Sequence, residues 1–225
     1  MPKHLQHALD KLKRSIFSLS GMVEESVRDA VRALDTRDSR LAQKVIDADL
    51  EIDHAEVDVE EEGLKILALH QPVAIDLRFI VAVLKINNDL ERIGDLAVNI
   101  AERAQFLATH EKVDIPFDFA GMAEKAQAMV KQSLDALVNL DAGSALAVCA
   151  ADDEVDAMNR QMYLQVGEGM REHPDQVESL THLLSVSRHL ERIADHATNI
   201  AEDVIYMVRG EIVRHQAEQY RTSEE

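Results

Sequence analysis

The feature that most constrains the fold of this chain is an internal repeat. Residues 190–202 match residues 90–102 at ten of thirteen positions, with a constant offset of 100. A second pair of matching segments, residues 47–53 and 150–156, is related by an offset of 103. Matches in the same order along the chain indicate a duplication, so we expect two copies of one structural unit.

Each copy carries three stretches in which apolar residues recur every three or four positions. The third stretch of the first copy runs through Val83, Ile86, Leu90 and Ile93, and residues 183–207 repeat this pattern in the second copy. Such spacing predicts amphipathic helices packed at shallow angles in a bundle. The low aromatic content, 4%, also suits helices better than strands. The expected fold is therefore all-α, with six long antiparallel helices in two tandem, repeat-related three-helix bundles.

Helix breaks are expected where turn-forming residues interrupt the apolar series. In the first copy these are residues 35–38 and 71–72, because the residue before a proline avoids helical geometry. Gly143 and Pro174 are the corresponding breaks in the second copy. Residues 114–117 divide the two halves. We therefore expect a first bundle over residues 1–112 and a second over residues 113–225.

The net charge of −18, from 42 acidic and 24 basic residues, argues against nucleic acid and anionic lipid as direct partners. No apolar stretch approaches the roughly 20 residues that span a bilayer. The first four residues, Met-Pro-Lys-His, already include a charged side chain, and no apolar segment typical of a signal peptide follows them. A single cysteine, Cys149, excludes an intramolecular disulfide and a cysteine-based zinc site. We expect a cytoplasmic protein without a membrane span.

Pairs of acidic residues four positions apart lie beside the apolar stripes of the second and third helices of both copies. At this spacing the two side chains of a pair point from one face of the helix. The four pairs are Asp49/Asp53, Glu91/Asp95, Asp152/Asp156 and Glu191/Asp195. A further turn of each third helix adds Asn99, Glu102, Asn199 and Glu202 as additional candidates.

Two interpretations of these acids remain open. Like charges at this spacing cost about a few tenths of a kcal/mol per pair, which invites an explanation for four repeat-related pairs. Carboxylates that converge from two helices are suitable oxygen ligands for magnesium, manganese, calcium or iron. A solvated acidic face would be an equally simple outcome in a chain with 42 acidic residues.

Other signals for chemistry are weak. Glu51 and His54 have the E-x-x-H spacing of di-iron bundles, but the repeat-related position holds Ala157, and that chemistry needs the motif twice. His196 follows the second acidic pair of the third helix and could supply a nitrogen ligand. The sequence has no phosphate-binding loop, dinucleotide fingerprint or H-E-x-x-H motif. We therefore expect a protein that is not an enzyme.

Three runs of residues carry a resemblance to a known family. Residues 71–80 read Q-P-V-A-I-D-L-R-F-I and residues 88–95 read N-D-L-E-R-I-G-D; residues 188–200 read R-H-L-E-R-I-A-D-H-A-T-N-I. In these runs the chain resembles the PhoU family, and the resemblance covers essentially its whole length. The second copy lacks the D-L-R run of residues 76–78, since Gln176, Val177 and Glu178 stand there.

The resemblance implies a function and a set of partners. Proteins of this family act with the phosphate ABC transporter ATPase and the phosphate-sensing histidine kinase, and they repress the phosphate-starvation response when phosphate is plentiful. We accordingly expect a non-enzymatic adaptor and negative regulator that forms a homodimer and reaches the inner membrane only through protein partners. The family's metal motif, (E/D)-x-x-x-D, is matched by the four acidic pairs, which implies ions such as iron, zinc, manganese or magnesium.

Two other functions compete with this expectation. The first is a metal-binding helical bundle with a storage or metal-dependent enzymatic role, which the single E-x-x-H spacing disfavours. The second is a purely structural adaptor, which gives the acidic pairs no role.

Overall fold

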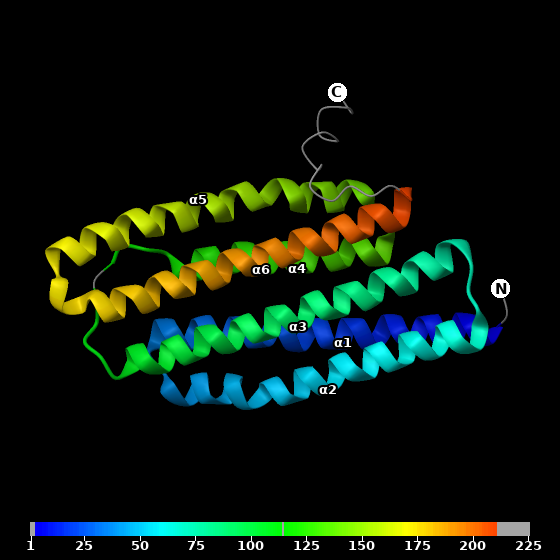
Figure 1. Ribbon diagram of the computed structural model, residues 1–225, viewed down its shortest axis with the longest axis horizontal. Helices are drawn as coiled ribbons and strands as arrows, with labels where there is room; N and C mark the ends of the chain where they lie inside the picture. Colours follow the sequence, from blue (N-terminus) through cyan, green and yellow to red (C-terminus); the bar gives the residue numbers. More distant parts are fainter. Residues whose placement is uncertain (1–2, 114, 211–225) are drawn as a thin grey trace, which may run out of the picture.

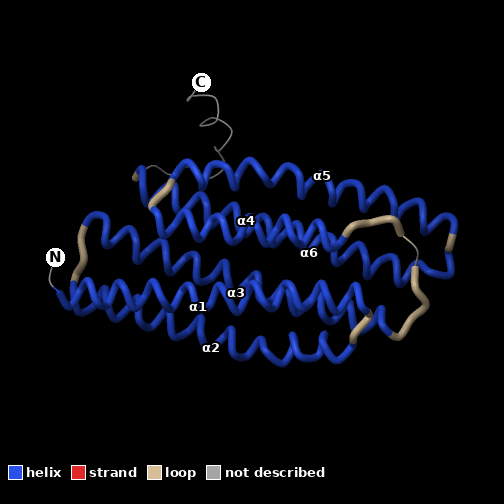
Figure 2. Tube along the Cα trace, turned by 180° about the vertical axis from the view of Figure 1, so that it is seen from behind, coloured by secondary structure: helices blue, strands red, loops and turns tan. Residues whose placement is uncertain are grey.

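The computed structural model describes residues 3–113 and 115–210, and within these ranges it consists of helices and short connections (Figures 1 and 2). The expected six long helices are confirmed, and the described residues contain no strand. The helices are α1 (Lys3–Thr36), α2 (Ser39–His70), α3 (Ala74–Ala108), α4 (Phe119–Asn139), α5 (Ala142–Glu172) and α6 (Val177–Arg209), with a 3₁₀ turn, η1 (Pro174–Gln176), before α6.

The turn between the first two helices of each bundle uses the same local chemistry. The Asp38 side chain caps α2 by accepting from the backbone N–H groups of residues 40 and 41. Asp141, 103 positions later, caps α5 in the same way through the N–H groups of residues 143 and 144. The break expected at Gly143 therefore lies slightly earlier, because Leu140 takes a left-handed conformation (φ 54°) and Asp141 begins the helix.

The other expected breaks are present. Gln71 adopts a left-handed conformation at the end of α2, and α5 ends at residue 172 before Pro174. The connection between α3 and α4 covers residues 109–118, of which residue 114 lies outside the described residues. The boundary that we place at 112/113 falls in this connection.

The two bundles lie side by side in an elongated molecule, with α1–α3 in one and α4–α6 in the other (Figure 1). Helices α3 and α6 pack against each other, and α1 also contacts α4. One apolar core runs through both bundles and includes Leu90 on α3 and Leu190 on α6, both fully buried. A helix that must pack on both sides needs apolar residues around much of its circumference, which α3 and α6 have.

Within residues 3–113 and 115–210, none of the helices combines the length and the hydrophobicity that a membrane span requires.

Candidate functional site

The first acidic cluster consists of Asp49 and Asp53 on α2 with Glu91 and Asp95 on α3. Partial burial and then the charges of Asp53 and Asp95 raise the pKa of Asp49. Burial, followed by the neighbouring Asp95 and by Asp53 and Glu56 on the facing helix, raises the pKa of Glu91, against the lowering effect of Arg92. These acids therefore face one another across the α2–α3 contact, and the ionised cluster repels itself.

Gly94 lets α2 and α3 approach each other closely at this cluster. A Cβ atom on residue 94 would lie 3.2 Å from Cγ2 of the buried Ile52 and 3.8 Å from Oδ1 of Asp49. The repeat-related residue of the second bundle is Ala194, which is fully buried. The first bundle thus uses a glycine to bring its acidic helices together.

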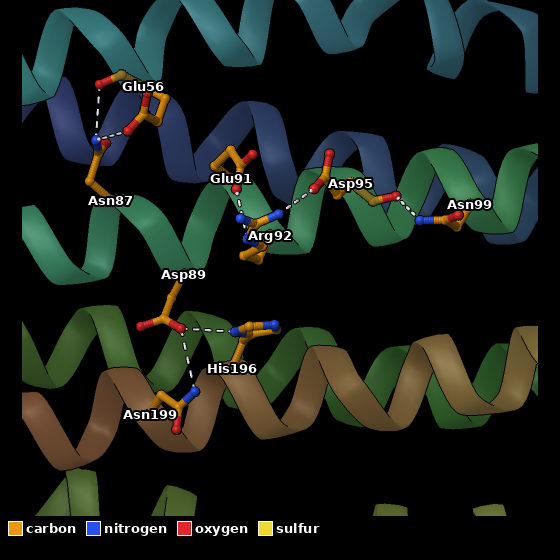
Figure 3. Close-up of polar contacts among 9 residues, drawn as sticks. All are labelled: Glu56, Asn87, Asp89, Glu91, Arg92, Asp95, Asn99, His196 and Asn199. Atoms are coloured by element: carbon orange, nitrogen blue, oxygen red, sulfur yellow. Dashed lines mark hydrogen bonds and ion pairs between the residues drawn. The ribbon is translucent and has the colours of Figure 1, made fainter.

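Arg92 is the cation within this cluster (Figure 3). Its Nε lies 3.4 Å from Oε2 of Glu91, and its Nη1 donates to Oδ2 of Asp95 across 3.2 Å. Because Arg92 is half-exposed, we expect this compensation to be screened by solvent and to remain partial.

The neighbouring buried Asn87 extends the polar contact between the two helices. Its Nδ2 donates to the backbone oxygen and to Oε1 of Glu56 on α2, both at 2.9 Å (Figure 3). The sequence pattern did not single out Asn87 or Glu56 as site residues. Glu56 lies one helical turn beyond Asp53 on the same face of α2, and that spacing is the signal that could have identified it.

The second acidic cluster consists of Asp152 and Asp156 on α5 with Glu191 and Asp195 on α6. Burial raises the pKa of Glu191, as do the charges of Asp195, Asp156 and Asp152, while Arg188 lowers it. Burial and then the charge of Asp156 raise the pKa of Asp195, while His196 and Arg192 lower it. The second bundle thus repeats the arrangement of the first: carboxylates from its second and third helices face one another.

The four additional candidates from the third helices, Asn99, Glu102, Asn199 and Glu202, lie in different surroundings in the two copies. Asn99 donates to the backbone oxygen of Asp95 across 2.7 Å, and exposed Glu102 pairs with Arg103 on its own helix. Asn199 and Glu202 line a hollow of about 510 Å³ between α3 and α6, together with α3 residues. The second-copy pair therefore faces the first bundle and lies on the seam between the bundles.

The donor atoms of both acidic clusters suit a hard cation, because each cluster offers several carboxylate oxygens from two helices. The raised pKa values of Asp49, Glu91, Glu191 and Asp195 reflect the burial and the crowding of these carboxylates. With the side chains as they lie in residues 3–113 and 115–210, no group of three or more His, Cys, Asp or Glu is close enough to hold an ion. Ion binding would therefore require the carboxylates to rotate toward one another. Asp53, exposed on α2, has the freedom to do so.

Comparison with known proteins identifies the family. The family model described as the PhoU domain matches residues 16–104 and again residues 119–204, one match in each bundle. The chain belongs to the PhoU family. Its two PhoU domains correspond to the duplication that the repeat indicates, and the resemblance noted in the sequence is confirmed.

Relatives in the PhoU family match over almost the whole chain. The phosphate-specific transport system accessory protein PhoU homolog of Pseudomonas aeruginosa is 40% identical over 208 residues, which cover 92% of this chain and 86% of that protein. The corresponding protein of Aquifex aeolicus is 39% identical, and the match covers 92% of this chain and 94% of that protein.

Solved PhoU structures share the fold. The crystal structure of PhoU from Pseudomonas aeruginosa has a TM-score of 0.85 and 39% identity, covering 92% of this chain and 99% of that one. The phosphate transport system regulatory protein PhoU from Streptococcus pneumoniae has a TM-score of 0.83 and 28% identity, covering 93% and 99%.

Proposed function

We propose that this PhoU-family chain is a non-enzymatic regulator of phosphate uptake and phosphate signalling. The observation that carries the proposal is the match over at least nine-tenths of the chain to proteins named as accessory proteins of the phosphate-specific transport system. A role in regulating phosphate transport follows from that family membership. The finer mechanism is our proposal.

In this mechanism the chain links two partners at the cytoplasmic side of the inner membrane. It binds the ATPase of the phosphate ABC transporter and the phosphate-sensing histidine kinase, and it keeps the kinase biased toward phosphatase activity while phosphate is plentiful. The helical faces supply the binding surfaces, and no covalent bond is made or broken. We expect the working form to be a homodimer.

The structure supports an adaptor in two ways. Both bundles share one apolar core, so a contact on one bundle can be transmitted to the other through rigid packing. The two acidic clusters also place carboxylates and arginines on the helical faces, and a charged protein partner can pair with such groups.

The experiment that tests the proposal is a deletion strain carrying a phosphate-starvation reporter. We expect the reporter to be active in phosphate-rich medium, and a plasmid copy of the chain to restore repression. Pull-downs with the intact chain should recover the transporter ATPase and the kinase. Unchanged reporter activity in the deletion strain would count against the regulatory role.

We further propose that the two acidic clusters bind metal ions, with iron, zinc, manganese and magnesium as candidates. The first site would use Asp49, Asp53, Glu91 and Asp95, and the second would use the four repeat-related carboxylates of α5 and α6. A bound cation would supply positive charge that offsets the mutual repulsion of these acids. Elemental analysis of purified protein tests this. The competing storage or metal-dependent enzymatic role stays less favoured, because Glu51 and His54 provide only one E-x-x-H spacing.

A further inference from the structure

The outer face of α2 carries a line of exposed apolar side chains. Leu50, Val57 and Leu64 are 61%, 47% and 52% exposed. Residues seven apart drift by only about 20° around a helix, so the three share one face. Single exposed apolar residues are ordinary, but three of them in line along one face form a continuous apolar strip that a partner helix can cover. We call these three residues the α2 stripe.

The second bundle shows that the fold does not require the α2 stripe. At the offset of 103 its α5 carries Asp153, Arg160 and Gly167 in place of the three stripe residues. The inward positions agree in both copies, since Ile52 and Val155 are both buried. The duplicated helices therefore keep the same core face and differ on the face that solvent reaches.

Helix α2 packs against α1 and α3 and lies at the outer edge of the first bundle (Figures 1 and 2). The three stripe side chains are therefore open to solvent at this edge, and Leu64 also borders a hollow between α1 and α2. A helix laid along this face could contact all three apolar side chains, since they span two heptads.

The charges beside the α2 stripe indicate what kind of helix would bind. Asp53, Glu60 and Glu61 are exposed one turn or less from the stripe residues. The hollow between α1 and α2 that Leu64 lines has a volume of about 630 Å³, and there Asp58 and Glu61 accompany Glu62, which pairs with Lys11 at 2.6 Å. A partner with lysine or arginine beside its apolar face would match this acidic rim.

A second copy of the chain is a poor occupant of this face. In a two-fold antiparallel pairing centred on Val57, Asp53 of one copy would face Glu61 of the other. Like charges in that position oppose association, and the chain as a whole carries a net charge of −18.

We propose that the α2 stripe docks an amphipathic helix of another protein, one whose apolar face is flanked by lysine or arginine. Its apolar residues cover Leu50, Val57 and Leu64, while its basic residues face the acids on either side. This surface goes beyond the regulatory role proposed above and does not depend on it.

Photo-crosslinking in the native host tests the proposal with the full chain. A crosslinking amino acid is placed at Val57, and at Arg160 as the repeat-related control. We expect position 57 to crosslink to a peptide with helical apolar spacing and net positive charge. We expect no crosslink from position 160. A crosslink from position 57 to a second copy, to lipid or to an acidic peptide would overturn the proposal, as would its absence.

Binding in solution separates the stripe from simple charge attraction. The probe is a synthetic 21-residue helix with leucine at heptad positions a and d and lysine at e and g. We expect the triple variant Leu50→Gln/Val57→Gln/Leu64→Gln to bind it at least about tenfold more weakly than the wild type, because the apolar contacts are lost. The matched control Tyr163→Gln/Leu164→Gln, on exposed positions of α5, should bind as the wild type does.

Two results would contradict the proposal here. The first is equal binding of the probe to the triple variant, which would leave charge alone as the cause. The second is equal binding of a probe with glutamate in place of lysine. Glutamine is a good helix former, so the variants are expected to fold. Should the triple variant unfold, the single variant Val57→Gln carries the same comparison.

Discussion

His196 on α6 donates its Nδ1–H to Oδ1 of Asp89 on α3 across 2.8 Å, and this contact joins the two bundles (Figure 3). Both side chains are largely buried, with 16% and 13% exposed. Asn199 on α6 donates to the same carboxylate oxygen across 3.4 Å. The repeat-related positions hold Leu96 and His189, so the duplication does not supply a matching pair there.

Removing the imidazole should weaken the contact between the bundles. We expect His196→Leu, which introduces the residue of position 96, to lower the free energy of unfolding by about 1–3 kcal/mol, because the buried Asp89 loses its main partner. Urea denaturation measures this. The double variant Asp89→Leu/His196→Leu removes both partners and should recover part of the loss. A double variant that loses the sum of both single effects would contradict this account of the pair.

Metal removal should destabilise the protein if the acidic clusters bind cations. Ligand binding to the folded state adds about 3–4 kcal/mol at 100- to 1,000-fold excess over the Kd, so a chelator should lower the Tm. Asp95→Asn together with Asp195→Asn should abolish this chelator sensitivity, whereas Asp175→Asn, an exposed acid outside both clusters, should not. A solvated acidic face predicts the reverse: a double variant that melts higher than the wild type with or without metal.

His189 should make the protein less stable in mild acid. Burial, and then the charges of Arg103, Arg192 and Arg188, lower the pKa of His189 to about 4, and neither ring nitrogen has a hydrogen-bond partner among the described residues. The unfolded chain takes up the proton near pH 6.5, before the folded chain does. This contribution to stability is therefore lost as the pH falls from about 7 toward 4.

The variant His189→Phe isolates this effect. Allowing for solvent around the half-buried ring, we expect the variant to lose about 1 kcal/mol less stability than the wild type between pH 7 and pH 5. The raised carboxylate pKa values in the acidic clusters act with the opposite sign, since folding then favours proton uptake. These carboxylates are present in both the wild type and the variant, so their effect cancels when the two stability curves are compared. Parallel stability curves for the two proteins would show that the ring does not titrate as described.

Gly94 should not tolerate a larger residue without cost. Alanine gains up to about 1 kcal/mol of helix propensity, but its Cβ would press on Ile52, and overpacking typically costs about 1–3 kcal/mol. We expect Gly94→Ala to lower the Tm. The control is Gly21→Ala on α1, where a Cβ meets no atom within 4 Å, so the propensity gain should raise the Tm. An equal rise in both variants would show that α2 and α3 do not need the close approach.

The sequence by itself determined the helices and the duplication. Apolar spacing in segments such as 83–93 reflects local periodicity, and Asp38 and Asp141 cap helices within two or three residues of themselves. The i,i+4 acidic pairs were visible for the same reason, because a single helix fixes which side chains share its face. The charge of Asp95 on α3 raises the pKa of Asp49 on α2, so carboxylates of the two helices lie near each other.

Only the tertiary structure decided how the two copies meet. The shared core around Leu90 and Leu190, the contact from Asp89 to His196, and the placement of Asn199 and Glu202 on the seam depend on how α3 and α6 are rotated toward each other. These contacts join residues about 100 positions apart, and the local pattern of either helix does not specify which residue faces which. A long amphipathic helix predicts that its apolar face is covered, but the partner and the register are set by packing of the whole molecule.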